Sequence, residues 1–454
     1  MIPPSPEPGP TNARRWTDIV LNGDSKPVIV DVRSPAEFAL DHIPGAINLP
    51  VLDNKERAIV GRLYSQGDVL RARMEGAALV CANISQMLSQ LCRDRYSDVP
   101  SDATNPDAHT PLERLRSNPS LLIYCWRGGQ RSNALATILS EIRFPAPVYL
   151  LVGGYRSWRR LLLRQLDAWP RWKMPGQFWV ITGLTGSGKS LVLQELARIN
   201  EVVLDLEKLA DHRGSLFGAN LTKMDDALSS GGINSSTEII SQRQFETRLH
   251  DLLTTDPRWI DSSQTIWIEC ESRSVGPHCR LNDSLWTRLR ATDDRWGAFR
   301  VWLEVPEEAR IDWIMRTYSS FIADRAALES ILLLLSRYHS AKRIAQWRSF
   351  ADRDDYGSLV QGLLRHHYDP LYEKSRASVM KEAAKHHLVH SIHLPTVDVH
   401  TVRNSLIPQL LDLAHAAHPR TTFVQKEWRN RHLFYHLPTL VALVGHPYYV
   451  LYIE

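Results

Sequence analysis

The sequence predicts an α/β protein made of two parallel-sheet domains followed by a helical region. Short apolar runs alternate with helix-like segments up to about residue 305, which is the pattern of parallel strands joined by crossover helices. The chain has 454 residues, more than one compact core normally holds, so two or three domains are expected. From about residue 306 to 415 the apolar spacing is helical, and no further series of strands is predicted.

The first domain is expected to contain three strands, at 28–32, 121–124 and 148–152. The first ends in Arg-Ser-Pro before a short helical stretch, the second runs into Cys125, and the third stops at Gly153-Gly154. Strand, turn and helix repeated in this order predict a parallel sheet. A polar, proline-rich stretch at 97–111 reads as an insertion within this domain.

A second domain begins after an arginine-rich helical pattern over 155–174, which Pro170 and Pro175 are expected to end. Its predicted strands lie at 178–182, 202–204, 265–268 and 299–303. Each ends at glycine, polar or acidic residues, so a second α/β layer is the simplest interpretation.

Composition excludes several classes of protein. The net charge is only +4, so any nucleic-acid binding depends on local basic patches. The cysteines are few, odd in number and without a CxxC pair, which argues against a disulfide scaffold or a structural zinc site and favours a reducing, cytoplasmic location. No run reaches the roughly 18 apolar residues of a membrane span, and the proline-rich start does not resemble a secretory signal.

A phosphate-binding loop is predicted between the strand at 178–182 and the following helix. The segment Gly183-Leu-Thr-Gly-Ser-Gly-Lys189-Ser190 fits GxxxxGK[ST]. Backbone N–H groups of such a loop surround a phosphate, the lysine bridges the outer phosphates, and the serine can hold Mg²⁺. The predicted diphosphate-binding residues are Gly183, Thr185, Gly186, Ser187, Gly188, Lys189 and Ser190. The pattern does not fix which molecule carries the phosphates.

A second loop, Cys125-Trp-Arg-Gly-Gly-Gln-Arg131-Ser132, places a thiol after a strand and before a helix. Its glycines allow N–H groups and a helix N-terminus to face the sulfur, and its arginines add positive charge, which together favour a nucleophilic thiolate. We predict Cys125 as the catalytic residue, supported by Arg127, Gly128, Gly129, Arg131 and Ser132. The alternative is a structural core cysteine. Cys81, Cys92 and Cys279 lie in ordinary sequence, and we interpret them as buried or incidental.

The first domain resembles a rhodanese domain. The resemblance rests on the loop above together with Asp31-Val-Arg33-Ser-Pro-Ala-Glu37-Phe, His42-Ile-Pro-Gly-Ala46 and Gly153-Gly154-Tyr155, in the expected order. It implies that Cys125 carries a persulfide or its selenium equivalent. It also implies that Asp31 and Arg33 close the first strand near the active loop, with a simple strand-capping ion pair as the alternative.

Further motifs, together with the rhodanese and P-loop pairing, are similar to those of the tRNA 2-selenouridine synthase family over about residues 17–400. They are 56–64, 205–218, 241–246, 269–276 and Tyr368-Asp369-Pro370-Leu-Tyr372. The resulting organisation is a leader at 1–16, a rhodanese-like domain at 17–160, a basic linker at 161–175, a P-loop domain at 176–305, a helical region at 306–415 and a tail of unknown role at 416–454.

The resemblance implies an enzyme that replaces the sulfur of 2-thiouridine at the wobble position of tRNA with selenium from selenophosphate. It also implies an S-geranyl intermediate made from geranyl diphosphate, whose diphosphate suits a P-loop. No tightly bound cofactor is expected, Mg²⁺ is a candidate, and an enzyme that supplies selenophosphate is a candidate partner. The alternative from another class is a P-loop kinase or NTPase with an appended sulfurtransferase domain.

Additional residues are expected near the P-loop. His212, Arg213 and Ser215 are predicted to contact diphosphate or tRNA phosphate, with surface pairing of Arg213 as the alternative. Glu269 and Glu271 follow the strand at 265–268, where an acid could hold Mg²⁺ with Ser190 or act on water. Arg273 could contact phosphate bidentately, or it could pair structurally with these glutamates.

The predicted tRNA surface is the basic segment before the second domain. Its basic residues are Arg156, Arg159, Arg160, Arg164 and Lys173. Tyr155, Trp158, Trp169 and Trp172 alternate with them, which suits phosphate contacts and stacking on unpaired bases. An equal alternative is that helical spacing buries these aromatic rings in a core.

Overall fold

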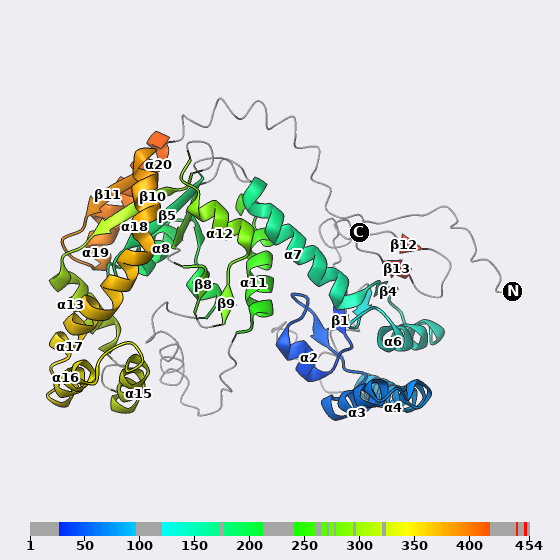
Figure 1. Cartoon of the computed structure of the whole chain (residues 1–454). Helices are drawn as coiled ribbons and strands as arrows, with labels where there is room; N and C mark the ends of the chain where they lie inside the picture. The colour runs from blue at the N-terminus through cyan, green and yellow to red at the C-terminus, as the bar shows by residue number, and fades with distance from the viewer. Residues whose placement is uncertain are drawn as a thin grey trace. The chain divides into compact units, whose positions relative to one another are not determined.

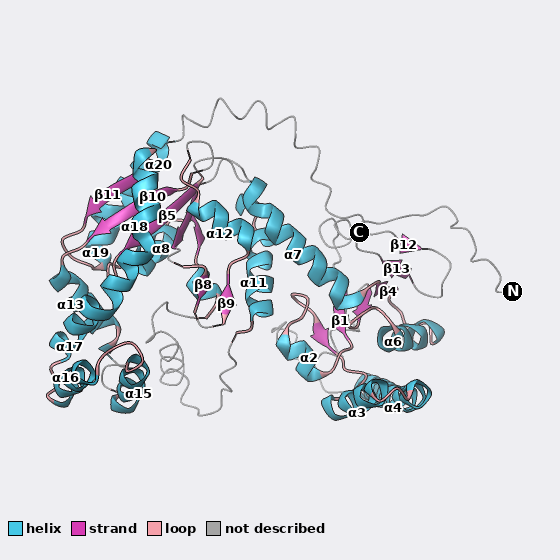
Figure 2. Ribbon diagram, viewed as in Figure 1, coloured by secondary structure: helices cyan, strands magenta, loops and turns pink. Residues whose placement is uncertain are grey.

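The computed structural model describes residues 27–96, 120–172, 177–211, 240–259, 265–269, 272–276, 278–293, 297–319, 324–417, 442–443 and 449–451. The chain divides into two compact units, Met1–Gln165 with Arg431–Glu454, and Leu166–Asn430. Figures 1 and 2 show their elements. The leader at 1–16, the insertion at 97–111 and most of the tail lie outside the described residues.

The first unit is built on a parallel sheet. Its strands are β1 (Val28–Asp31), β2 (Ile47–Asn48), β3 (Leu121–Tyr124) and β4 (Val148–Leu151), and its helices are α2 (Pro35–Leu40), α3 (Asn54–Ser65), α4 (Val69–Tyr96), α6 (Gln130–Glu141) and the start of α7 (Gly154–Trp172). β3 lies between β1 and β4, and all of its residues are buried. This central position explains its wholly apolar sequence, because both faces of a parallel sheet are covered.

The tail also contributes to this sheet. β13 (Tyr449–Leu451) pairs in parallel with β4, and β12 (Ala442–Leu443) pairs antiparallel with β13. The sheet order is therefore β12-β13-β4-β3-β1-β2. The last described residues of the chain thus cover the edge of the first domain's sheet.

The second unit contains a five-stranded parallel sheet in the order β11-β10-β5-β7-β6. The strands are β5 (Phe178–Gly183), β6 (Val202–Leu204), β7 (Ile266–Glu269), β10 (Phe299–Glu304) and β11 (Val389–His393), and the accompanying helices are α8 (Lys189–Arg198), α9 (Leu206–Leu209), α11 (Gln242–Thr255) and α12 (Asp283–Arg290). A short hairpin, β8 (Ser274–Val275) and β9 (Cys279–Arg280), and the turn η2 (Pro257–Trp259) complete this part. β5 is central, so the loop that follows it has strands on both sides.

A helical region follows β10, as predicted. It contains α13 (Glu307–Thr317), α15 (Arg325–Leu335), α16 (Ala341–Asp352), α17 (Tyr356–Leu363), α18 (Asp369–Lys385), α19 (Val399–Thr401) and α20 (Ile407–Ala417), with π-helical turns η3 (Leu364–Tyr368) and η4 (Val402–Leu406). The α/β fold class, with a rhodanese-like sheet, a P-loop sheet and this helical region, is confirmed.

Two local expectations differ from the structure. β11 lies within the region expected to lack strands, because Val389–His393 is a short edge strand that contains two histidines and a serine and has little apolar signal. Pro170 does not end its helix, since α7 continues to Trp172. Proline removes the N–H that would bond to the Leu166 carbonyl, and that carbonyl instead accepts a hydrogen bond from the Asn282 amide at 2.8 Å.

An ion pair connects the last part of the helical region to α8. Arg403 of η4 donates to both carboxylate oxygens of Glu195 at 2.9 and 3.0 Å, and Arg198 donates to the same group at 2.7 Å. These hydrogen bonds lower the pKa of Glu195 from 4.5 to about 2. Because the pKa is lower in the folded chain, the pair stabilises the fold above pH 4.5, and this contribution is lost as the pH falls toward 2.

Replacing Arg403 tests this contribution. Arg403→Met should lower the free energy of unfolding at pH 7 by about 1.5–3 kcal/mol, the usual range for hydrogen bonds to a charged group. Urea unfolding at a series of pH values measures it. The difference between wild type and variant should narrow below pH 4.5, and a difference that stays constant down to pH 2.5 would contradict the assignment to Glu195.

Candidate functional sites

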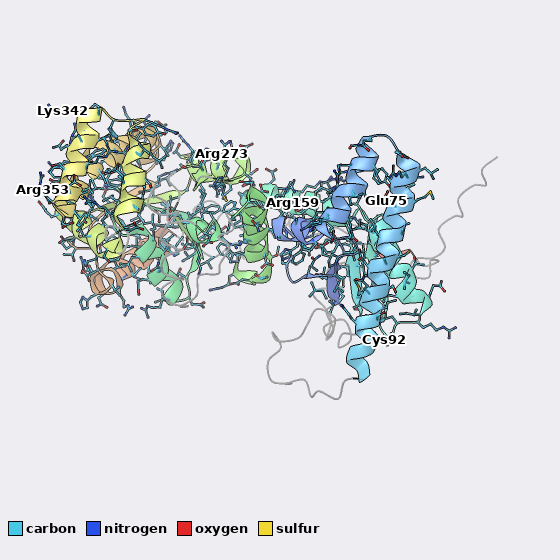
Figure 3. All side chains as sticks on the ribbon, turned by 90° about the horizontal axis from the view of Figure 1, so that it is seen from below. Glu75, Cys92, Arg159, Arg273, Lys342 and Arg353 are labelled. Atoms are coloured by element: carbon cyan, nitrogen blue, oxygen red, sulfur yellow. The ribbon has the colours of Figure 1, made fainter. Side chains whose placement is uncertain are left out.

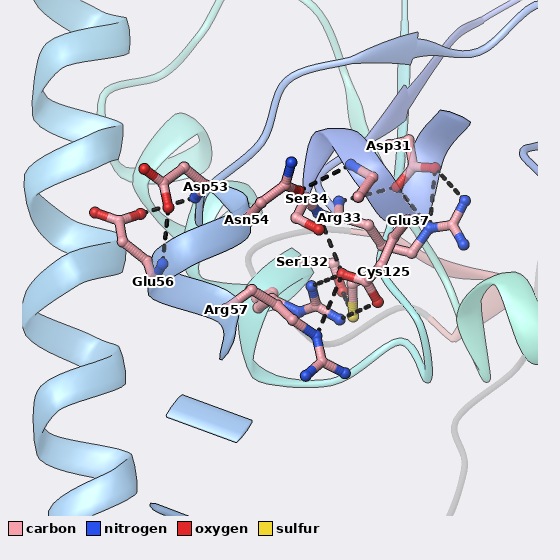
Figure 4. Close-up of polar contacts among 12 residues, drawn as sticks. Asp31, Arg33, Ser34, Glu37, Asp53, Asn54, Glu56, Arg57, Cys125 and Ser132 are labelled. Carbon is pink, nitrogen blue, oxygen red and sulfur yellow. Dashed lines mark hydrogen bonds and ion pairs between the residues drawn. The ribbon is translucent and has the colours of Figure 1, made fainter. Parts of the chain in front are cut away.

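Cys125 lies at the carboxyl end of β3, where the chain turns into α6. Its side chain is buried, and its Sγ accepts hydrogen bonds from the Gly129 N–H and the Ser132 hydroxyl, each at 3.2 Å. Figure 4 shows Ser132 beside the sulfur. Two donors and the N-terminal end of a helix therefore face this atom, an arrangement that stabilises negative charge on sulfur. The structure brings Cys125, Gly129 and Ser132 together as predicted.

The Cys125 loop packs closely on the turn that follows β4. Gly128 has φ +65, and a Cβ there would lie 2.6 Å from the Leu151 carbonyl oxygen. Gly154 has φ +57, and its Cβ would lie 2.2 Å from the Cys125 carbonyl oxygen. That same oxygen accepts a hydrogen bond from the Tyr155 N–H at 2.9 Å. The two glycine turns are thus required for the backbone contact that shapes the loop.

Asp31 and Arg33 form a buried ion pair at the end of β1, with Nη2 and Oδ2 2.6 Å apart. Arg33 also donates to the Asp41 carbonyl at 2.7 Å and lies 4.2 Å above the Tyr155 ring. Burial alone lowers the pKa of Arg33, but the hydrogen bonds and charge of Asp31 outweigh it and raise the pKa. The pair lies at the carboxyl end of β1, which is the position that both predictions for it share.

Arg131 is held at the start of α6 by Glu37 of α2. Its guanidinium donates to the Glu37 carboxylate at 2.7 and 3.3 Å, and Arg57 of α3 lies 3.9 Å from the same carboxylate. Burial raises the pKa of Glu37, but the hydrogen bonds and charge of Arg131 outweigh it, and the net pKa is lowered. Arg127 is exposed on the loop. The sequence motif contained Glu37, but its pairing with Arg131 was not foreseen.

The P-loop follows β5, and α8 begins at Lys189. Gly186 and Gly188 have φ values of +83 and +79, which favour glycine. A Cβ on Gly188 would lie 2.5 Å from a methyl group of Val397. Ser187 is buried, and within the described part of the chain its hydroxyl has no hydrogen-bond partner. These features fit a loop that donates to an anion.

Lys189 and Ser190 meet Glu269 at the end of β7. Lys189 Nζ lies 3.6 Å from one carboxylate oxygen of Glu269, and the Ser190 hydroxyl donates to the other at 3.3 Å. Lys189 also donates to the Gly183 carbonyl at 2.9 Å. The predicted juxtaposition of Glu269 with the P-loop is therefore present. A hydroxyl and a carboxylate side by side are ligands that suit Mg²⁺.

Residues of the helical region contact the P-loop, although no role was predicted for them from the sequence. Arg310 of α13 donates to the Thr185 carbonyl at 3.1 Å and to both oxygens of Asp369 at 3.0 Å. The Tyr372 hydroxyl accepts a hydrogen bond from the Gly183 N–H at 3.2 Å. The only sequence signal for them was the motif at 368–372.

Other predicted residues have different positions. Arg273 pairs with Asp283 and donates to the Leu281 carbonyl, and Figure 3 shows it on the second unit. Its role as a phosphate ligand stays a prediction. The remaining candidates His212, Arg213, Ser215, Glu271 and Lys173 lie outside the described residues.

The predicted tRNA surface is partly buried. Arg156, Arg160 and Arg164 are exposed at four-residue spacing along α7. Arg159 is largely covered and lies 3.9 Å from Asp41. Tyr155, Trp158 and Trp169 are buried. These rings therefore pack in hydrophobic cores, as the alternative prediction stated.

Within the described ranges, no cluster of three or more histidine, cysteine or acidic side chains is suited to a metal ion. The cysteines described there are free, with Cys81 and Cys92 exposed on α4 and Cys279 buried. Burial raises the pKa of Cys279. No helix in this part of the chain has the length and apolar character to cross a membrane.

Together the fold and the two loops define a protein that joins a rhodanese-like thiol site to a P-loop domain. Residues 20–161 match the model of the rhodanese-like domain, and residues 176–331 match that of the tRNA 2-selenouridine synthase AAA domain. The first match confirms the resemblance to a rhodanese domain, and the second confirms the resemblance of the P-loop domain to the tRNA 2-selenouridine synthase family.

Relatives named tRNA 2-selenouridine synthase align with most of the chain. The protein from Nitrosomonas eutropha is 29% identical over 76% of this chain and 87% of the relative. The relative from Pseudomonas fluorescens is 28% identical over 81% of this chain and 93% of its own length. The relative from Nitrosomonas europaea is 31% identical over 64% of this chain and 63% of its own length.

The glycine turn beneath Cys125 can be tested by substitution. Gly154→Ala should destabilise the first unit by at least about 2 kcal/mol more than Gly45→Ala, because the added methyl group collides with the Cys125 carbonyl. Gly45 is a matched control, since it has φ +75 and open space around its Cβ position. Urea unfolding of the full chain measures both. Equal losses would show that only the positive φ matters at residue 154.

Proposed function

We propose that this protein modifies the wobble uridine of tRNA, replacing the sulfur of 2-thiouridine with selenium. The observation that carries the proposal is the Cys125 sulfur with two hydrogen-bond donors, in one chain with a P-loop whose Lys189 meets Glu269. Relatives that align with most of this chain bear the name tRNA 2-selenouridine synthase. The proposed location is the cytoplasm, where thiols stay reduced.

Cys125 is proposed to carry or deliver the selenium that selenophosphate supplies. Its thiolate would attack the phosphorus of selenophosphate, so that an S–P bond forms, the P–Se bond breaks and selenium leaves at the selenide level, which requires no oxidant. Water would then release phosphate from the sulfur, and Gly129 and Ser132 would stabilise the negative charge on that sulfur. Arg127 is exposed beside it and Arg131 is fixed by Glu37, so positive charge surrounds the place where an anionic donor would approach. A separate enzyme that makes selenophosphate is the proposed supplier.

The P-loop is proposed to bind geranyl diphosphate. In the first step the thiouridine sulfur attacks C1 of the geranyl group, a C–S bond forms, the C–O bond breaks, and diphosphate leaves. Lys189 and the loop N–H groups would stabilise the leaving anion. Ser190 and Glu269 would hold Mg²⁺, which offsets phosphate charge. In the second step selenium attacks C2 of the base and geranyl thiolate leaves.

Reconstitution tests both steps with 2-thiouridine tRNA, geranyl diphosphate and selenophosphate, followed by nucleoside mass spectrometry. Cys125→Ala should lower selenouridine formation at least about 100-fold and leave geranylation intact, because only the selenium step uses the thiolate. Lys189→Ala should lower geranylation at least about tenfold.

Selenouridine at the wild-type rate from Cys125→Ala would contradict the assignment of the thiol. The kinase or NTPase alternative makes a different prediction. It requires ATP turnover without tRNA, lost in Lys189→Ala, and no modified nucleoside from the wild type.

The exposed arginines of α7 are proposed to contact tRNA phosphates. The Arg156 N–H donates to the Trp126 carbonyl at 3.1 Å, so the start of this basic stripe adjoins the Cys125 loop. Arg160→Gln should weaken tRNA binding about two- to fivefold and reduce its dependence on salt by about one ion.

Filter binding at several salt concentrations measures this effect. Arg143→Gln is the control. Arg143 is exposed just after the C-terminal end of α6, whereas Cys125 lies just before the N-terminal end of this helix. Equal effects of the two substitutions would place the tRNA elsewhere.

A further inference from the structure

Arg310 links the P-loop to the helical region through one side chain. Its guanidinium is 5% exposed, donates to the Thr185 carbonyl of the loop, and forms two 3.0 Å hydrogen bonds with Asp369. Its Nε is buried and has no hydrogen-bond partner within the described part of the chain. A buried arginine with two planar bonds to one carboxylate has a fixed orientation. The Thr185 backbone is consequently held from outside the loop.

Tyr372 contacts the first residue of the same loop. Its hydroxyl oxygen accepts the Gly183 N–H at 3.2 Å, and its ring lies 5.7 Å from Lys189 Nζ. The contact therefore fixes the end of β5 and places the face of an aromatic ring near the lysine, where it attracts the cation. Both Asp369 and Tyr372 lie in the first turn of α18.

The segment before these residues is irregular. α17 passes through the π-helical turn η3 and continues into α18 at Asp369. A π-turn adds a residue to the helix and changes which side chains face a neighbour, and such turns are frequent at functional sites. Here the residues that follow it, Asp369 and Tyr372, are those that reach Arg310 and Gly183.

Packing between α13 and the loop adds a further contact. A Cβ at Gly186 would lie 2.8 Å from Ile314 Cδ1 and 3.1 Å from the Arg310 carbonyl oxygen. The left-handed turn at Gly186 therefore lies directly on α13. Tyr372 contacts the loop at Gly183, and Arg310, which is held by Asp369, contacts it at Thr185. With the packing at Gly186, the helical region therefore contacts the loop at three residues.

We propose that Arg310, Asp369 and Tyr372 are positioning residues that hold the P-loop in the conformation that binds a diphosphate. This proposal rests on the proposed function, since it concerns how the same site recognises its diphosphate. The three residues act through the loop backbone and through Lys189. The helical region is thereby part of the phosphate-binding site.

The experiment measures binding of inorganic pyrophosphate and of geranyl diphosphate to the full chain by calorimetry. Asp369→Asn should weaken both affinities about tenfold, because loss of a charged hydrogen bond releases Arg310. Arg310→Lys, which retains the charge but not the fork, should weaken them to a similar degree. Tyr372→Phe retains the ring but loses the hydroxyl, and it should weaken both affinities a few-fold.

A matched control exists between the same helices. Glu307 of α13 accepts 2.8 and 2.9 Å hydrogen bonds from Arg365 of η3, so it links α13 to the same segment without touching the P-loop. Glu307→Gln should leave both affinities within twofold. The thermal midpoint of each variant shows whether the chain is folded, and Tyr372→Phe and Arg310→Lys carry the test if Asp369→Asn unfolds.

The outcomes separate the two proposals. Weaker diphosphate binding in the folded positioning variants, with Glu307→Gln unchanged, supports the inference. Wild-type affinity in these variants, or an equal loss in Glu307→Gln, overturns the inference and leaves the proposed function standing. A wild-type protein that binds neither diphosphate overturns the proposed function and with it the inference.

Discussion

The two sites depend above all on how closely other parts of the chain approach their loop backbones. Gly154 packs on the Cys125 carbonyl, and Gly186 packs on α13. Such approaches leave no room for a side chain, and they fix N–H groups in one direction. A preorganised set of donors stabilises an anion without first reorganising, which is why both loops can serve reactions that develop negative charge on sulfur or on phosphate oxygen.

The two sites have the same topological origin. Each lies where a buried parallel strand ends and a helix begins, with β3 leading to Cys125 and β5 to Lys189. The carboxyl ends of parallel strands form one edge of a sheet, and ligands of open α/β sheets bind there. The groups that contact the thiol differ in chemistry from those that contact Lys189. The thiol receives neutral donors and a nearby arginine, whereas Lys189 is paired with a carboxylate that can also take part in metal binding.

Local patterns in the sequence predicted both loops, the approach of Glu269 to the P-loop, and the strands β1, β3, β4, β5, β6, β7 and β10, because each of these strands is a short apolar run followed by residues of special geometry. The sequence did not predict the short strands β2, β8, β9, β11, β12 and β13. β11 is short and rich in histidine, and it exists because β10 offers it an edge. The roles of Arg310 and Glu37 were also missed, since their partners Asp369 and Arg131 are distant in the chain. Periodicity carries no information about such pairs.

The pairing of β13 with β4 has a consequence for how the protein is made. β4 emerges from the ribosome before the second unit, whereas β13 emerges after it. During that interval the edge of β4 presents unpaired backbone groups, which other strands can join. The rhodanese-like sheet is therefore completed only after translation of the P-loop unit. A nascent chain that stalls after β4 and before β13 would therefore expose an unpaired strand edge, prone to aggregation, next to an otherwise folded thiol site.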